Sequence, residues 1–238
     1  MPYTLLLRLA GPMQSWGTQS RFSMRDTGLE PSKSGVIGLL CAALGRPRED
    51  TAIVRRLAVL RMGVRVDREG VLKKDFHTAN DVAKASGGTK DTEPSDRWYL
   101  ADADFLVGLE DSDDTLLREL DHALQHPHWQ LFLGRKSFVP SSLVWVPDGL
   151  HEASLCATLE AYKWETNRRE KPPARLRLVI DATKETATEV RQDVPLSFAT
   201  RHFTIRYVKT TWIDFPQGES DARDAQTVFV EVDSQSTQ

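Results

Sequence analysis

The sequence predicts an α+β protein with a ferredoxin-like or RRM-like core, in which a four-stranded antiparallel sheet carries helices on one face. Three observations lead to this prediction. Apolar residues in the first 133 positions follow strand and helix spacings in the order β-α-β-β-α-β. The chain has 238 residues, enough for one large domain or two small ones. Its 40% hydrophobic and 27% charged content is ordinary for a globular chain that buries a core.

The first strand and the first helix are predicted from the N-terminal part of the chain. Residues 3–9 form a compact apolar run, typical of a central strand, and 11–33 is loop-like, with several Gly and Pro residues. Ser32 or Ser34 can cap the mostly apolar helix that follows, and Gly45 ends it. This segment therefore supplies the first strand and the first covering helix of the core.

The remaining core elements follow from alternation or from helical spacing. They are a short helix over 49–57, strands over 60–66 and 71–77, a strand over 98–109, a helix after Ser112 or Asp113, and a strand over 129–133. We expect the strands at 60–66 and 71–77 to pair, because only a short turn separates them. Residues 78–97 have little apolar content, and an excursion of that length is usually functional or disordered.

The pattern weakens after residue 140, where we predict fewer elements. They are a helix near 152–162, a polar loop over 163–173, a strand near 175–180 and a strand near 201–212. We therefore divide the chain into an RRM-like domain over 1–140, with an insertion at about 78–98, and a region over 141–238 that packs on it. The end of that region, after Pro216, is predicted to be partly disordered.

Charge is unevenly distributed along the chain. The net charge is −3, but residues 1–75 hold 13 Lys and Arg against 7 Asp and Glu, whereas residues 91–121 hold 2 against 11. A protein that coats nucleic acid is usually basic overall, because neutralisation of phosphates drives such binding. A polyanion should therefore be held locally, by the N-terminal half. Ordinary solvated faces are the alternative reading of the same pattern.

Several function classes find no support in the sequence. No apolar run approaches the roughly 20 residues of a membrane span, and the N-terminus does not read as a signal peptide. Cys41 and Cys156 form no CxxC motif, which favours a reducing cytoplasm. We expect no cofactor and no metal. One pattern partly resembles a phosphate-binding loop, Gly87-Gly88-Thr89-Lys90, but it lacks the required spacing. Two pairs partly resemble metal-ligand patterns, His122 with His126 and Asp102 with Asp104.

Basic and aromatic residues form a more coherent set near the expected ends of the strands. A helix N-terminus with a lysine beside it suits a phosphate, and planar side chains can stack on unpaired bases. The residues in question are Gln14, Ser15 and Trp16 after the first strand, Lys33, Ser34 and Gly35 at the first helix, His77, Arg97, Trp98 and Tyr99 around the excursion, and Arg135 and Lys136 after the strand at 129–133. Trp16 and Trp98 could equally be core residues.

Four segments, in this order, resemble a known family. They are Leu7-Arg8-Leu9-Ala10-Gly11-Pro12-Met13-Gln14-Ser15-Trp16-Gly17, Pro31-Ser32-Lys33-Ser34-Gly35-Val36-Ile37-Gly38-Leu39-Leu40, Phe76-His77-Thr78 and Leu133-Gly134-Arg135-Lys136-Ser137. Together they are similar to the CasD-type subunits of the type I-E CRISPR complex Cascade, in the RAMP superfamily. The resemblance covers roughly residues 3–146 and implies the ferredoxin-like core read above, with a projecting hairpin, or thumb, at about 78–98.

The resemblance also implies a function. It is that of a non-catalytic subunit that grips the 5′ handle of the CRISPR RNA (crRNA), beside CasC-type backbone subunits and a CasA-type large subunit, and that meets target DNA through the complex. Phosphates are expected at Lys33, Ser34, Arg46, Arg135 and Lys136, with bases or the thumb near the aromatic residues. Two alternatives stay open. One is a metal-independent endoribonuclease using His77 or Tyr99 with Lys136, and the other is a protein-docking module.

Overall fold

The computed structural model describes residues 1–18, 24–165 and 173–214, and it confirms the α+β class. The core elements, in chain order, are strand β1 (Tyr3–Ala10), helices α1 (Lys33–Ala43) and α2 (Thr51–Ala58), strands β4 (Arg61–Arg68) and β7 (Asp104–Asp111), helix α3 (Thr115–Gln125) and strand β8 (Trp145–His151). With α2 as an addition, the order of these elements is β-α-β-β-α-β, but β7 and β8 stand where the sequence predicts the strands at 71–77 and 129–133.

The main sheet of the described chain has seven strands in the order β10-β11-β9-β4-β7-β1-β8. The strands that follow β8 are β9 (Arg175–Asp181), β10 (Glu189–Ser197) and β11 (His202–Asp214). Neighbouring strands pair antiparallel throughout. Because β9 pairs with β4, the C-terminal strands continue the sheet that the N-terminal strands begin.

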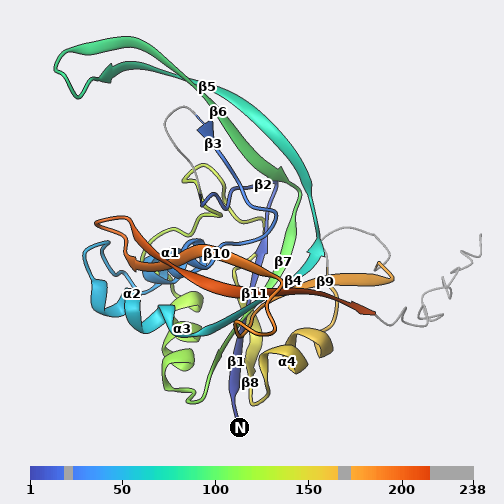
Figure 1. Cartoon of the computed structure of the whole chain (residues 1–238). Helices are drawn as coiled ribbons and strands as arrows, with labels where there is room; N and C mark the ends of the chain where they lie inside the picture. Colours follow the sequence, from blue (N-terminus) through green and yellow to red (C-terminus); the bar gives the residue numbers. More distant parts are fainter. Residues whose placement is uncertain (19–23, 166–172, 215–238) are drawn as a thin grey trace, which may run out of the picture.

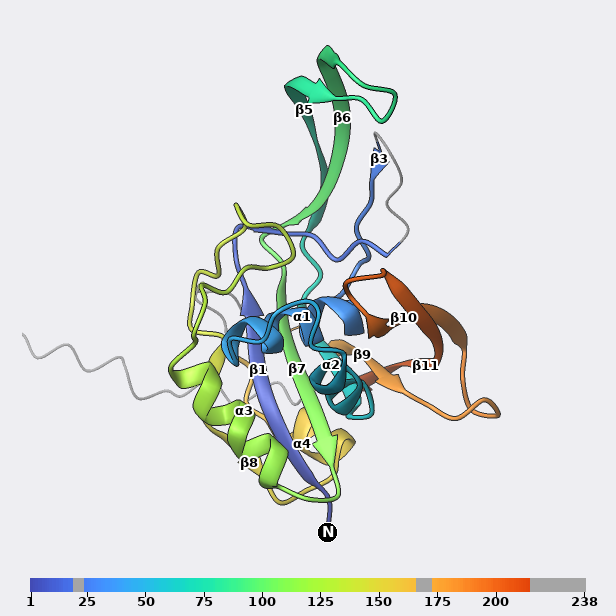
Figure 2. The same cartoon turned by 90° about the vertical axis from the view of Figure 1, so that its left-hand side faces the viewer.

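Both faces of this sheet are covered, which explains the unbroken apolar run in β1. Leu5, Leu7 and Leu9 belong to the large core under α1, α2 and α3, whereas Leu6 belongs to a smaller core with α4 (Leu155–Ala161). Figure 2 shows α1, α2 and α3 in front of the sheet and α4 behind it. The sequence predicts helices on one face only, so α4 on the opposite face is a difference from that expectation.

Two glycines that face each other on neighbouring strands make room for α4. Gly63 of β4 pairs with Gly108 of β7. A Cβ atom at Gly63 would lie 2.8 Å from Leu159, and one at Gly108 would lie 2.6 Å from Leu155, both on α4. The helix therefore packs directly on the sheet backbone, and a side chain at either position would push it away.

A long antiparallel hairpin projects from the body of the protein (Figure 1). It consists of β5 (Val71–Ala83) and β6 (Thr89–Ala101), paired from Val71↔Ala101 to Ala83↔Thr89. The predicted excursion at about 78–98 is this hairpin, but the pairing extends further toward the body. Two short strands, β2 (Met13–Gln14) and β3 (Met24–Arg25), pair with β6 near its base and complete a second sheet.

The structure corrects two strand predictions around this hairpin. The strand at 71–77 was expected to pair with the strand at 60–66, but it is the start of β5 and pairs with β6, while β4 pairs with β7 and β9. The strand expected over 98–109 is two strands, β6 and β7. The chain turns between them at Asp102, whose φ is 58°. That turn lets one strand belong to the hairpin and the next to the main sheet.

Residues 129–133 form a loop and not the predicted strand. The backbone N–H groups of His128 and Trp129 donate to the last carbonyl groups of α1, at 2.9 and 3.1 Å. Leu131 and Leu133 are buried, which is why their alternate spacing resembles that of a strand. The segment therefore satisfies the C-terminal end of α1, and the place beside β1 is taken by β8.

The C-terminal predictions agree with the structure at three elements and miss a fourth. The helix near 152–162 is α4, and the strands near 175–180 and 201–212 are β9 and β11, with shifted ends, while β10 was not predicted. The disordered tail and most of the loop at 163–173 lie outside the described residues. The division into two parts at residue 140 stays a prediction. No helix in the described chain has the length and apolarity to cross a membrane.

A cluster of charges is buried on the α4 face of the sheet. Arg8 donates to Asp104 at 2.8 Å and lies 3.5 Å from Asp67, and Asp67 in turn pairs with Arg65, which is fully buried. Arg65 also donates to three backbone carbonyl groups at the end of α4 and just beyond it. Burial, only partly offset by Arg8, raises the pKa of Asp104 to about 6. The ionised form of Asp104 is therefore disfavoured in the folded protein.

Asp104→Asn should change how stability depends on pH. The folded protein holds the Asp104 proton more tightly than the unfolded chain, so wild type loses stability as the pH rises from about 4 to about 6, while the variant does not lose this term. Between about pH 4 and pH 6, the unfolding free energy of wild type should fall by about 3 kcal/mol relative to that of Asp104→Asn. Above about pH 6 the difference between the two proteins should stay constant. Urea unfolding at a series of pH values measures it.

Asp214→Asn is the matched control, because its carboxyl is 89% exposed and its ion-pair partner in the described part of the chain is the exposed Arg175. It should shift the unfolding free energy by less than about 1 kcal/mol at each pH. A difference between wild type and Asp104→Asn that stays flat from pH 4 to pH 7 would contradict the raised pKa.

Candidate nucleic-acid interface

Three of the predicted site residues, Gln14, Ser15 and Trp16, lie inside the protein and join the hairpin to the core. The Gln14 amide donates to the carbonyls of Leu9 and Ala103 at 3.0 and 2.8 Å and accepts from the indole N–H of Trp16 at 3.1 Å. The Ser15 hydroxyl donates to the Trp98 carbonyl at 3.3 Å. Their side chains are satisfied within the chain, so they are not part of the exposed surface defined below.

Lys33 is also buried, at the start of α1. Its ammonium group donates to Asp181 at 2.9 Å, and its backbone N–H donates to Asp193 at 2.9 Å. Arg206 bridges the same two carboxylates, and the ion pairs with Arg206 keep the pKa of Asp193 below its usual value despite burial. We call these four residues the α1 anchor. The expected phosphate contact at Lys33 is replaced by an ion pair that ties α1 to β9, β10 and β11.

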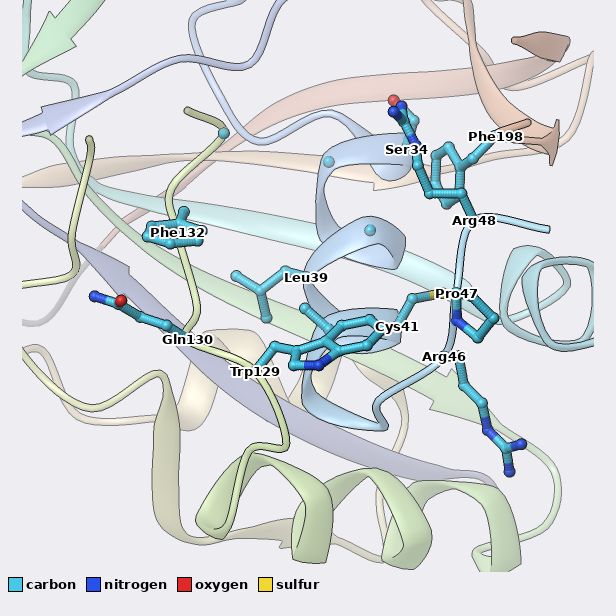
Figure 3. Close-up of a pocket in the computed structure, with 14 residues that line it drawn as sticks. Ser34, Leu39, Cys41, Arg46, Pro47, Arg48, Trp129, Gln130, Phe132 and Phe198 are labelled. Atoms are coloured by element: carbon cyan, nitrogen blue, oxygen red, sulfur yellow. The ribbon is translucent and has the colours of Figure 1, made fainter. Parts of the chain in front are cut away.

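A groove runs along the side of α1 that the sheet does not cover. Its volume is about 380 Å³. Its walls come from α1, the loop after it, the loop at 129–134 and the end of β10, and among the described residues none of those that line it is acidic. The principal lining residues are Ser34, Gly35, Arg46, Arg48, Trp129, Phe132 and Phe198 (Figure 3). We call this the α1 groove.

Of the predicted residues, Ser34, Gly35 and Arg46 line the α1 groove. Gly35 has no room for a side chain, because a Cβ atom there would lie 2.8 Å from the ring of Trp16. Glycine at this position therefore lets α1 pack closely against the buried Trp16 ring. Figure 3 shows Phe198 beside Ser34 and Arg48 at one end of the groove. The groove thus combines cationic side chains with exposed aromatic rings.

Three arginines gather at the base of the hairpin and form what we call the arginine cluster: Arg25, Arg97 and Arg135. Arg25 of β3 pairs with Arg97 of β6 in parallel register, so both side chains point to the same face of this small sheet. The Arg135 guanidinium donates to the Trp98 carbonyl at 2.8 Å and lies 5.2 Å from the ring of Phe138. Burial first, and then the charges of Arg97 and Arg25, lower the pKa of Arg135, with Asp75 and Asp26 opposing.

The predicted aromatic residues at the end of the excursion lie on opposite faces of the hairpin. Tyr99 points to the same face as Arg97 and contacts Phe138, with ring centroids 6.0 Å apart. Trp98 points to the other face, where the Lys74 ammonium lies 5.8 Å from its ring. His77, exposed on β5, is opposite Ser95 and shares the face of Arg97. Lys136 is exposed in the loop next to Arg135.

The structure therefore divides most of the predicted residues into three groups. Arg97, Tyr99, Arg135 and Lys136 lie at or near the hairpin base, Ser34, Gly35 and Arg46 line the α1 groove, and Gln14, Ser15, Trp16 and Lys33 support these surfaces from within. His77, further out on the hairpin, and Trp98, on its other face, belong to none of them. Sequence reasoning missed Arg25, Arg48, Trp129, Phe132, Phe198 and Arg201. They lie on four separate segments without any periodic pattern, and only the fold brings them together.

The metal patterns noted in the sequence find no support in the described part of the chain. No group of three His, Cys, Asp or Glu residues is arranged to hold a metal ion there. Asp104 is paired with Arg8, and the His122 and His126 rings contact each other with centroids 5.4 Å apart. Cys41 and Cys156 are free thiols, and burial raises the pKa of Cys41 to about 11. A thiol with that pKa is a poor nucleophile at neutral pH.

The fold and the surface together define a class of protein. It is an α+β protein with a projecting hairpin whose base carries cationic and aromatic side chains. Residues 4–209 match the model of a family described as CRISPR-associated protein (Cas_Cas5). Because the match covers most of the chain, the chain belongs to this family, and the resemblance to it read from the sequence is confirmed.

Relatives and solved structures agree with that assignment. The CRISPR system Cascade subunit CasD of Escherichia coli (strain K12) is 37% identical over 147 residues, which span 56% of this chain and 65% of the relative. A solved structure titled "Crystal structure of Cas protein" is 44% identical, with a TM-score of 0.73, over 90% of this chain and 96% of that one. A chain of a "CRISPR RNA-guided surveillance complex" is 36% identical, with the same TM-score, over 89% and 90% of the two chains.

Lys33→Ala should act on stability, because Lys33 is an interior residue of the α1 anchor. Its side chain is only 7% exposed, and removing it leaves Asp181 with one ion-pair partner fewer. The free energy of unfolding should fall by about 3 kcal/mol, as measured by urea unfolding followed by circular dichroism.

Lys136→Ala is the control for this substitution, since it removes the same charge from an exposed position. It should leave the free energy of unfolding within about 0.5 kcal/mol of wild type. Equal stability of Lys33→Ala and Lys136→Ala would show that the anchor contributes little.

Proposed function

We propose that this chain is a non-catalytic RNA-binding subunit of a Cascade-type CRISPR surveillance complex, and that it holds the repeat-derived 5′ handle of the crRNA. The observation that carries the proposal is the arginine cluster at the hairpin base, next to a groove lined by arginines and aromatic rings without an acidic residue in the described chain. Membership of the Cas5 family and the likeness to a chain of an RNA-guided surveillance complex support it.

Single-stranded RNA suits this surface better than a duplex does. The surface carries exposed arginines for phosphates and exposed rings, including Trp129, which is 45% exposed. Unpaired bases can turn outward and stack on such rings, while a duplex hides its bases in the helix. The overall net charge of −3 argues against indiscriminate coating of nucleic acid and for a local site.

The hairpin offers a surface for protein partners. Leu72 and Phe76 lie on one face of β5 and are 48% and 66% exposed. Val71 lies on the other face and is 58% exposed. Exposed apolar residues on a projecting element are typical of a contact surface. In the proposal the hairpin reaches CasC-type backbone subunits, the CasA-type large subunit is a neighbour, and target DNA is met through the assembled complex in the cytoplasm.

The arrangement of the acid–base candidates favours binding over cleavage. His77 pairs with Ser95, and Tyr99 lies four residues further along β6, which separates them by about 13 Å along the strand. A general acid and a general base acting on one phosphate need to lie within hydrogen-bond reach of it. Repeat RNA incubated with the purified chain in EDTA should therefore stay intact, and specific cleavage abolished by His77→Ala would establish the endoribonuclease alternative.

Arg97→Ala should weaken RNA binding and its dependence on salt. The guanidinium is half-buried at the hairpin base and bonds only the Ser95 hydroxyl at 3.2 Å among its described contacts. Losing one phosphate contact should lower affinity about tenfold and flatten the slope of log K against log salt by about 0.7. Fluorescence anisotropy with the RNA that co-purifies with the tagged chain, identified by sequencing, measures both quantities.

Arg56→Ala is the control, because Arg56 is exposed on α2 and pairs with Glu119 away from this surface. It should leave both affinity and slope unchanged. Co-purifying RNA without repeat-derived ends, or identical salt slopes for Arg97→Ala and Arg56→Ala, would count against the proposed surface.

A further inference from the structure

A second cavity opens beside the α1 groove, where the turn between β10 and β11 approaches the hairpin base. Its volume is about 270 Å³, near the lower bound of about 300 Å³ for small-ligand pockets. It shares Ser34, Arg48 and Phe198 with the α1 groove, so the two spaces adjoin. Arg25 belongs both to this cavity and to the arginine cluster. We call this cavity the Arg–Phe cup.

Three arginines line the Arg–Phe cup without a carboxylate partner. Arg25, Arg48 and Arg201 come from β3, from the loop after α1 and from the β10–β11 turn. None of them forms an ion pair with another residue in the described ranges, and no acidic residue of those ranges lines the cup. Three positive charges around a space of this size repel each other and favour an anion between them.

The other arginines of the C-terminal strands are paired, which makes Arg201 stand apart. Arg206 bonds Asp181 and Asp193, and Arg177 bonds Glu30 and Glu69. Arg201, eight residues after Asp193 in the chain, is exposed and has no such partner among the described residues. The same part of the fold therefore neutralises its inner arginines and leaves the one that faces the cup unneutralised.

The backbone of Arg201 adds an independent observation. Its φ is 53°, in the left-handed region, which glycine and asparagine adopt more readily than arginine does. Residues held in such conformations cluster at ligand sites, where the side chain is needed despite the strain. Asparagine would adopt this turn conformation more easily, so the backbone of the turn gives no reason for an arginine at position 201.

Two aromatic rings complete the wall of the cup. Phe198 and Phe203 flank the β10–β11 turn, and their centroids lie 6.4 Å apart with an angle of 65° between the rings. Both are partly exposed. The α1 anchor holds this hairpin against the start of α1, because Asp193 of β10 and Arg206 of β11 both bond within it. The cup is therefore built on a fixed frame, although its parts are far apart in the sequence.

We infer that the Arg–Phe cup binds one nucleotide of single-stranded RNA, with its phosphate between Arg25, Arg48 and Arg201 and its base against Phe203. This inference rests on the proposed function and extends the RNA surface from the hairpin base to the C-terminal turn. A strand lying in the α1 groove reaches the cup through the residues that the two spaces share.

Arg201→Asn tests the phosphate contact without straining the turn. Asparagine tolerates the left-handed conformation, so the melting temperature should stay at or above that of wild type. Affinity of the full chain for the co-purifying RNA should fall about tenfold, and the salt slope should flatten by about 0.7. Arg175→Ala is the matched control, because Arg175 lies on β9, is exposed and pairs with Asp214 outside the cup.

Phe203→Ala tests the base contact through RNAs that carry a single abasic position. Wild type should lose about tenfold or more in affinity when the abasic position is the nucleotide in the cup, and Phe203→Ala should show no further loss at that position. Additive losses at every position, or unchanged affinity and slope in Arg201→Asn, would overturn the cup while leaving RNA binding by wild type intact. A wild-type chain that binds no RNA would overturn the proposed function and the cup together.

Discussion

The buried ion pairs of the α1 anchor are the interaction on which the surfaces of this protein depend. Lys33 and Arg206 share two carboxylates; Lys33, Asp193 and Arg206 are buried, and the Asp181 side chain is 14% exposed. Charges this deep stabilise only when each is paired and hydrogen-bonded, because desolvation costs several kcal/mol per ion. The geometry meets this condition, with contacts of 2.6 to 2.9 Å. As a result the start of α1 and the β10–β11 hairpin keep one relative position, and the groove and the cup keep their shape.

A second principle is the separation of charges into an interior group and a surface group. Arg8, Arg65 and Arg206 lie inside and each bonds at least one carboxylate, whereas Arg25, Arg48 and Arg201 lie at the surface without one in the described chain. The small excess of acid in the composition hides this separation, because the acidic stretch at 91–121 is spread over β6, β7, α3 and the loops between them. The net charge of the chain therefore does not show where an anion binds. The arginines that have no carboxylate partner indicate the place better.

The sequence could predict the features that depend on neighbouring residues, such as helix caps and the buried faces of helices. Ser32 caps α1 as expected, accepting from the Gly35 N–H at 3.2 Å, and the buried face of α3 follows from its leucine spacing. The strand predicted at 129–133 failed because the apolar alternation there serves a loop that caps α1, which only tertiary structure reveals. Arg97 and Arg135 could be found beside recognisable motifs. Arg201 could not, because nothing in its neighbourhood signals that it meets Arg48, more than 150 residues earlier in the chain.

Bringing like charges together from distant segments has an energetic consequence for the free chain. Burial is the main cause of the lowered pKa of Arg135, and the charges of Arg97 and Arg25 add to it, so the cations of the arginine cluster are close enough to repel each other. When no anion is present, tertiary contacts must offset this repulsion. The phosphates of a bound RNA backbone would neutralise the charges and remove it. A ligand that binds only the folded form stabilises it by mass action. In the proposed function, RNA that contacts the hairpin base, the α1 groove and the C-terminal turn at once therefore also holds these three parts together, so that the subunit is most stable when it is loaded.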